Sequence, residues 1–138
     1  MNILIADDEK HFRLLLTKLF RDSYNIIEHD TGDTALLDVK YHLCKPTQYD
    51  LVILDKSMPG MDGIQVLKEI RKAEVNAGIK STERTKIILI TSDSHPDTRF
   101  ESFQNECDAF ISKPLVMSKV AKKFDKLGIK IKNIADKL

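Results

Sequence analysis

The sequence predicts an α/β protein with a doubly wound, five-stranded parallel sheet between two layers of helices. Short apolar runs alternate five times with stretches of helical periodicity, a pattern typical of βα units packed around one sheet. Three of the runs, 3–6, 51–54 and 87–90, are apolar without alternation, as in strands that helices cover on both faces. The length of 138 residues suits one such domain.

Each apolar run is expected to be a strand, and each periodic stretch a helix. The strands are expected at 3–6, 24–27, 51–54, 87–90 and 109–111. The helical stripes are Phe12, Leu15, Leu16, Leu19 and Phe20; Leu36, Val39 and Leu43; Ile64, Leu67 and Ile70; Phe100, Phe103 and Cys107; and Val116, Val120, Phe124 and Leu127. Right-handed crossovers give a three-layer α/β/α sandwich, for which the flavodoxin-like strand order 2-1-3-4-5 is the natural choice at this length.

Residues typical of helix boundaries agree with these positions. Asp62 is expected to cap the third helix, and Gly128 to follow the end of the fifth. Pro96 and Pro114 suit the first turns of the fourth and fifth helices. Residues 1–127 are therefore the predicted domain, and 128–138 are expected to be a short tail.

Composition excludes several classes of protein. The chain is 42% hydrophobic and 31% charged with a net charge of +1, unlike disordered chains or general polyanion binders. No apolar run approaches the ~18 residues of a membrane span, and the amino terminus turns acidic at Asp7, unlike a secretory signal. Cys44 and Cys107 form neither a disulfide framework nor a metal knuckle, so a cytoplasmic location is expected.

Polar side chains follow the strong apolar runs. Asp7 and Asp8 follow the first, Asp55 the third, Thr91 the fourth, and Lys113 follows the fifth after one serine. The carboxyl ends of parallel strands meet at one edge of the sheet, where such sheets bind ligands. We therefore expect three carboxylates, a hydroxyl and an ammonium to share one pocket.

Each of these residues has an ordinary explanation when it is taken alone. Asp7 and Asp8 could cap the first helix, and Asp55 could belong to a turn. Thr91 could cap a helix, and Lys113 could be solvated. That account requires four unrelated coincidences at four strand ends, so a shared pocket is the preferred interpretation.

The chemistry of such a pocket follows from its charges. Three carboxylates repel one another, and Lys113 offsets one unit of their charge. The remaining deficit and the all-oxygen ligands favour Mg²⁺ over zinc or copper. A carboxylate beside the ion could attack phosphorus and form an acyl phosphate, with Thr91 and Lys113 on the other phosphoryl oxygens. The sequence thus predicts a phosphoryl-acceptor site.

Five segments together resemble the receiver domain of two-component response regulators: 3–9, 50–55, 58–63, 88–92 and 110–114. The resemblance implies that Asp55 is the phosphoacceptor for a sensor histidine kinase or a histidine phosphotransfer protein. It implies that Asp8, Asp55 and the backbone carbonyl of Ser57 ligate Mg²⁺, with Asp7 helping through water.

The resemblance also implies a two-state switch. Thr91 would turn toward the phosphoryl group, Phe110 would follow into the space that it leaves, and Lys113 would bind a phosphoryl oxygen. This change would reach the face of the fourth helix, fifth strand and fifth helix. With only 128–138 after the domain, the chain is expected to be a stand-alone receiver that docks a partner or passes phosphate along a relay, and not an enzyme beyond its own phosphorylation and dephosphorylation.

Some positions depart from the common pattern of that family. Lys56 stands where an apolar residue is more usual, and Ser57 and Asp93 tend to flank the path of an attacking water. We predict that these three tune the lifetime of the acyl phosphate, with Lys56 pairing with Asp93. Glu106 and Cys107 replace a pair of small residues before the last strand, which leaves the geometry of that loop open.

Residues 115–138 contain seven lysines and two aspartates. They form either a basic docking surface or, as we favour, a solvated helix face. With one aromatic residue and no arginine in the segment, nucleic-acid binding is not expected.

Three other functions have weaker support. A phosphatase of the haloacid-dehalogenase type usually carries Asp-x-Asp after its first strand, whereas Asp55-Lys56-Ser57 follows the third. A flavodoxin-like FMN carrier would need a loop that cradles phosphate where Asp7-Asp8-Glu9 would repel it. A docking module that works without phosphate would usually lack one of the reacting groups.

Overall fold

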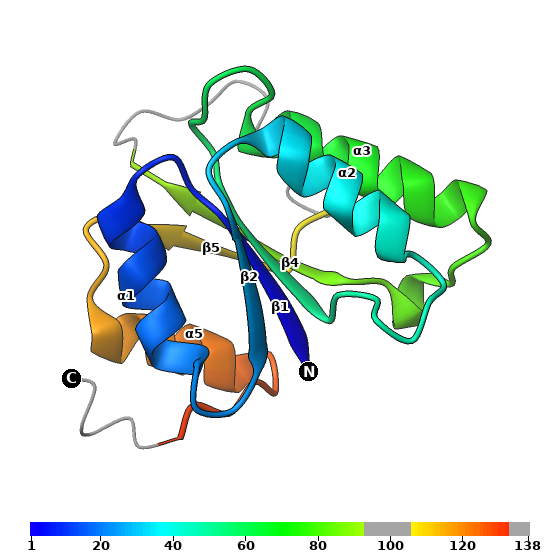
Figure 1. The fold of residues 1–138 in the computed structure, drawn as a ribbon. Helices are drawn as coiled ribbons and strands as arrows, with labels where there is room; N and C mark the ends of the chain where they lie inside the picture. Colours follow the sequence, from blue (N-terminus) through cyan, green and yellow to red (C-terminus); the bar gives the residue numbers. More distant parts are fainter. Residues whose placement is uncertain (93–105, 133–138) are drawn as a thin grey trace.

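The computed structural model describes residues 1–92 and 106–132, and Figure 1 shows the fold. In these residues, five strands form one parallel sheet in the order β2-β1-β3-β4-β5. This confirms the predicted flavodoxin-like order. The elements are β1 Asn2–Ala6, α1 Lys10–Phe20, β2 Asn25–His29, α2 Gly32–His42, β3 Leu51–Asp55, α3 Gly63–Asn76, the short 3₁₀ helix η1 Ser81–Glu83, β4 Lys86–Thr91, β5 Ala109–Ser112 and α5 Met117–Lys126.

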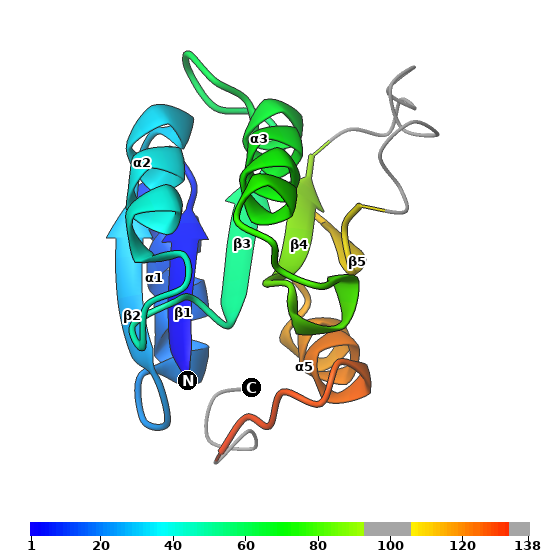
Figure 2. The ribbon, with the colours of Figure 1, turned by 90° about the vertical axis from the view of Figure 1, so that its right-hand side faces the viewer.

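Helices cover both faces of the sheet, α2 and α3 on one and α1 and α5 on the other (Figures 1 and 2). Successive strand residues point to opposite faces. Leu4 and Val52 accordingly join the core beneath α2 and α3, whereas Ile3 and Ile53 join the core beneath α1 and α5. The apolar runs 3–6, 51–54 and 87–90 of the central strands are buried throughout, as predicted for strands covered on both faces. No helix in the described part of the chain is long and apolar enough to cross a membrane.

The predicted helix boundaries are partly correct. Asp62 caps α3 in a reciprocal pair with Gln65: each backbone N–H donates to the other side chain at 2.9 Å. Gly128, with φ of 78°, follows the last residues of α5. Pro114 does not lie in the first turn of α5, because the helix begins three residues later at Met117. Phe100, Phe103 and Pro96 lie outside the described residues.

The apolar stripe expected on α1 is also narrower than predicted. Leu16, Leu19 and Phe20 are buried in the core. Leu15 is 36% exposed, and Phe12 is only half-buried. Phe12 is one turn before Leu16 on the same side of the helix, so the stripe extends past the core at the first turn, where Phe12 contacts Lys113.

A buried ionic network, which the sequence analysis missed, joins the opposite end of the sheet. Arg71 on α3 is 9% exposed and donates to the carbonyls of Glu106 and Thr85, both at 2.7 Å. It also pairs with Glu74 at 2.7 Å and with Asp108 at 3.2 Å. These contacts fix the chain before β4 and β5, and they define the loop at Glu106 and Cys107 whose geometry the sequence left open.

Candidate functional site

The carboxyl ends of β1, β3 and β5 bring three of the predicted site residues into contact. Nζ of Lys113 lies 3.2 Å from Oδ2 of Asp55 and 3.3 Å from Oδ2 of Asp7. The three side chains are 8%, 3% and 1% exposed, respectively. This is the convergence expected from the parallel sheet, and it makes a buried pocket with two carboxylates around one ammonium.

Backbone hydrogen bonds hold these side chains in place. The backbone N–H of Asp7 donates to the carbonyl of His29 at 3.1 Å, and Asp7 Oδ1 accepts from the backbone N–H of Glu9 at 2.9 Å. Asp55 ends β3, and its Oδ1 accepts from the backbone N–H of Ser57 at 3.1 Å. The N-cap position of α1 is occupied by Glu9, whose side chain makes no capping hydrogen bond, so neither Asp7 nor Asp8 is the N-cap residue of this helix.

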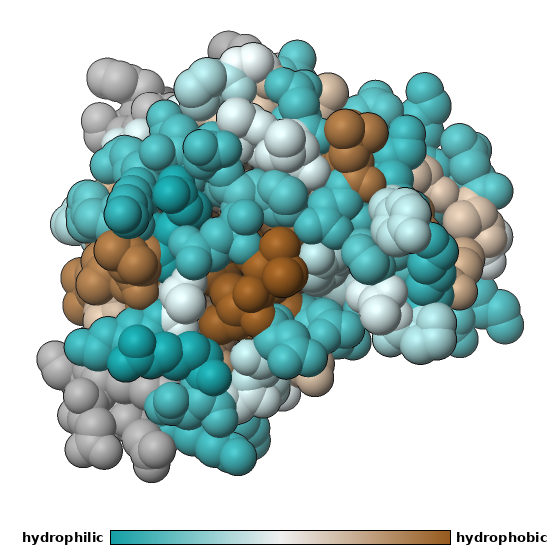
Figure 3. All heavy atoms as spheres, in the orientation of Figure 1, coloured by the Kyte–Doolittle hydropathy of each residue, from teal (hydrophilic) through white to brown (hydrophobic). Residues whose placement is uncertain are grey.

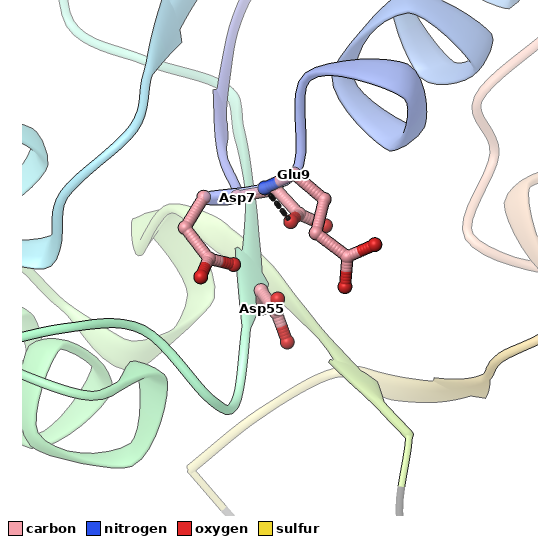
Figure 4. Close-up of side chains that lie close together, drawn as sticks. Asp7, Glu9 and Asp55 are labelled. Carbon is pink, nitrogen blue, oxygen red and sulfur yellow. Dashed lines mark hydrogen bonds between the residues drawn. The ribbon is translucent and has the colours of Figure 1, made fainter.

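Glu9 adds a carboxylate that the sequence analysis did not assign to the site. Carboxylate oxygens of Asp7, Asp8, Glu9 and Asp55 lie within 4.8 Å of one another. Figure 4 shows Asp7 and Glu9 close to Asp55, with the hydrogen bond between the first two dashed. Oε1 of Glu9 also lies 3.4 Å from Nζ of Lys113. The sequence signal that could have identified Glu9 was its position directly after the acidic pair Asp7 and Asp8.

Burial and charge shift the ionisation of both central groups. Burial, followed by the negative charge of Asp7, raises the pKa of Asp55 from 3.8 to about 7, although Ser57 N–H and Lys113 oppose the rise. For Lys113, burial lowers the pKa, but the charges of Asp55 and Asp7 outweigh it and the net shift is upward. The pocket therefore holds more negative charge than its one ammonium compensates.

The donor set fits a divalent cation. Oδ2 of Asp7 is buried, and apart from its ion pair with Lys113 it accepts no hydrogen bond within the described residues. Four carboxylates offer oxygen ligands within a small volume. Oxygen-only ligation suits Mg²⁺. Of the predicted ligands, Asp7, Asp8 and Asp55 lie together, and Ser57 is the second residue after Asp55, with its backbone N–H on that carboxylate.

The expected switch residues lie on the neighbouring strands. Thr91 ends β4 and is half-buried; its carbonyl accepts from the backbone N–H of Lys113 at 2.7 Å. Phe110 on β5 is half-buried and packs against the core beneath α2 and α3. Lys56 is also half-buried, and its backbone N–H donates to the carbonyl of Ile90 at 2.8 Å. Asp93 lies outside the described residues, so its pairing with Lys56 stays a prediction.

Comparison with known proteins agrees with this geometry. The family model of the response regulator receiver domain matches residues 3–125. Chemotaxis protein CheY-3 of Vibrio cholerae is 33% identical over 129 residues, which cover 92% of this chain and 91% of that protein. Transcriptional regulatory protein ResD of Bacillus subtilis is 35% identical over 113 residues, which cover 81% of this chain and 41% of ResD. The chain belongs to the response regulator receiver family.

Solved structures show the same fold. CheY in the CheX–CheY–BeF₃–Mg²⁺ complex of Borrelia burgdorferi has a TM-score of 0.75 at 29% identity, with 94% of this chain and 90% of that chain covered. Response regulator TrrA of Thermotoga maritima, solved with Mg²⁺ and BeF, has a TM-score of 0.69 at 34% identity, with 91% and 97% covered. The chain is thus a signalling module of the receiver type.

Proposed function

We propose that Asp55 accepts a phosphoryl group from a phosphohistidine of a sensor histidine kinase or a histidine phosphotransfer protein. The observation that carries this proposal is the contact of Asp55 with Lys113 at 3.2 Å inside a cluster of four carboxylates. A carboxylate oxygen of Asp55 forms the new bond to phosphorus, and the bond from phosphorus to the donor's imidazole nitrogen breaks. The imidazole leaves with the electron pair of that bond.

The other residues of the pocket neutralise and orient the phosphoryl group. Lys113 pairs with one phosphoryl oxygen, and the hydroxyl of Thr91 donates to another. Asp7, Asp8, Asp55 and the carbonyl of Ser57 would hold Mg²⁺, which supplies positive charge against the phosphoryl oxygens when it is bound. Two relatives of this fold were solved with Mg²⁺ and a beryllium fluoride, which supports that ligand set.

Phosphorylation would then change a docking surface. Thr91 moves toward the phosphoryl group because the charge of the site changes. Phe110 follows Thr91, since the two residues lie on neighbouring strands. Of the expected face of fourth helix, fifth strand and fifth helix, β5 and α5 belong to the described residues, whereas the predicted fourth helix lies outside them. A CheY of this fold was solved in complex with CheX, which supports docking of a protein partner on the chain.

The acyl phosphate would be hydrolysed at a rate set by Lys56, Ser57 and Asp93. Lys56 and Ser57 directly follow Asp55 in the sequence, and Asp93 comes two residues after the end of β4. Polar groups at these positions would position the attacking water. Ser57→Ala and an Asp93→Ala variant should each change the dephosphorylation rate, measured by loss of the phosphorylated mass after the donor is removed. Rates equal to wild type in both would contradict this assignment.

We further propose a cytoplasmic receiver that acts by docking or relay and has no turnover of other substrates. Residues 1–127 would be the receiver and 128–138 a tail. The exposed Cys44 thiol suits a reducing compartment. Nucleic acid is not a proposed partner, since the described lysines of α5 are dispersed along a helix with one aromatic residue.

The test is incubation with Mg²⁺ and phosphoramidate, followed by intact-mass measurement. One added phosphoryl group is expected on the wild type and on Asp125→Asn, a control at an exposed aspartate of α5. Asp55→Ala should stay unmodified. Modification that survives Asp55→Ala would overturn the proposal. Catalytic hydrolysis of a phosphomonoester would favour the haloacid-dehalogenase type, and partner binding without any phosphorylation would favour a phosphate-independent docking module.

A further inference from the structure

The ammonium of Lys113 also contacts an aromatic ring. Its Nζ lies 3.9 Å from the centroid of Phe12, which is the third residue of α1. The same nitrogen contacts Asp55, Asp7 and Glu9 at 3.2, 3.3 and 3.4 Å. The ammonium thus has carboxylates and an aromatic face around it, and its side chain is only 8% exposed.

Phe12 lies on the same side of α1 as the buried residues, but one turn before Leu16, and it is not part of the core beneath the helix. The core side of the helix is formed by Leu16, Leu19 and Phe20. Phe12 is half-buried, and its ring also lies 4.1 Å from the ring of His11, measured between centroids. A large apolar side chain at the mouth of an acidic pocket therefore makes a contact that core packing does not explain.

We propose that Phe12 is a positioning residue that holds the ammonium of Lys113 next to Asp55. This rests on the proposed function of Asp55 as phosphoacceptor. A lysine side chain has many rotamers, and the face of an aromatic ring attracts a cation without adding formal charge. A further carboxylate would hold the ammonium equally well but would repel an incoming phosphoryl group. The ring therefore restrains Lys113 in a pocket that must still accept an anion.

The test compares non-aromatic and aromatic replacements. Phe12→Leu and Phe12→Met keep an apolar side chain but remove the ring, whereas Phe12→Tyr keeps the ring. Leu14→Ala, at a position 53% exposed on the same helix, controls for general effects on α1. Two measurements are made: the ¹H shift of the Lys113 ε-methylene by NMR without phosphodonor, and the initial rate of phosphorylation by phosphoramidate with saturating Mg²⁺.

The expected NMR result is an upfield ε-methylene resonance in the wild type and Phe12→Tyr, because the protons lie near the ring face. That resonance should move toward the position of a solvated lysine in Phe12→Leu and Phe12→Met. The phosphorylation rate should fall about three- to tenfold in the two non-aromatic variants, which corresponds to one partly desolvated cation–π contact. Leu14→Ala and Phe12→Tyr should phosphorylate within about twofold of the wild type.

Three results would overturn the inference: a wild-type resonance at the solvated position, wild-type rates in Phe12→Leu and Phe12→Met, or a Phe12→Tyr variant as slow as Phe12→Leu. Failure of the proposed function gives a different result. In that case the wild type gains no phosphoryl group on Asp55, while the NMR comparison, which needs no donor, still decides whether Phe12 holds Lys113.

Discussion

Nζ of Lys113 lies 3.2 Å from Oδ2 of Asp55, although the two residues are 58 positions apart in the chain. Lys113 follows β5 and Asp55 ends β3, with β4 between them in the sheet. The contact therefore reaches across one strand, and it ties the edge strand to the centre of the site. It also means that the residues proposed to bind the phosphoryl group contribute to the stability of the fold.

Removal of the ammonium should destabilise the protein in a pH-dependent way. Lys113→Met leaves Asp7 and Asp55 buried together without a cation, and the expected loss in free energy of unfolding at pH 8 is about 2–3 kcal/mol. The loss should shrink near pH 5, because protonation of Asp55 then relieves the repulsion. Urea denaturation at pH 8 and pH 5 measures the loss in free energy of unfolding. Lys130→Met, at a side chain 84% exposed, is the control and should cost less than about 0.5 kcal/mol; equal losses in the two variants would contradict the assignment.

Neutralisation of Asp55 should stabilise the protein above neutral pH. Its pKa is raised from 3.8 to about 7 in the fold, so the folded state binds this proton more tightly than the unfolded state does. Stability is therefore lost as pH rises from about 4 to about 7, and Asp55→Asn avoids that loss. Without Mg²⁺, the variant should match the wild type near pH 4 and exceed it by up to about 4 kcal/mol at pH 8.

The measurement is urea denaturation in EDTA across this pH range. Asp125→Asn is the matched control, since it removes one exposed carboxylate outside the cluster. A stability difference between Asp55→Asn and the wild type that is independent of pH would show that Asp55 does not titrate as its environment implies.

Mg²⁺ should raise the thermal stability of the wild type. A bound ion would relieve repulsion among Asp7, Asp8 and Asp55, and an excess of a hundredfold over its dissociation constant would add about 2.7 kcal/mol. The effect should be larger at pH 8 than at pH 6, because a protonated Asp55 competes with the metal. Thermal unfolding with MgCl₂ is compared with NaCl of equal ionic strength. Asp8→Asn should lose most of the effect, and an unchanged response in that variant would exclude Asp8 as a ligand.

The Arg71 network should contribute strongly to folding. Arg71→Met leaves the buried carboxylate of Glu74 without its cation and removes two donors to backbone carbonyls, so the expected loss is about 3 kcal/mol. Lys72→Met, at the exposed neighbouring position of α3, should change stability by less than about 0.5 kcal/mol. The double variant Arg71→Met, Glu74→Met should recover part of the loss in urea denaturation. No recovery would indicate that the carbonyl contacts, and not the ion pair, carry the effect.

The parts of the fold that could be read from the sequence are those with a local physical cause. The unbroken apolar runs of β1, β3 and β4 predicted strands covered on both faces, because burial on both sides of a strand requires apolar residues at every position. The cap of α3 by Asp62 depends on residues three positions apart. The meeting of Asp7, Asp55 and Lys113 followed from one rule of topology, since parallel strands all end at the same edge.

The remaining features depend on where each helix residue lies relative to the core and on which distant group faces it. Periodicity assigned Phe12 to the core, but it lies one turn before the buried part of α1, beside Lys113. The local pair of Arg71 with Glu74 does not reveal that Arg71 is buried, because its partners Glu106 and Asp108 follow it by 35 and 37 positions. The apolar pattern of a sequence shows which residues are buried. It does not show which distant segments pack together, and that packing decides the partner of each charged or aromatic side chain.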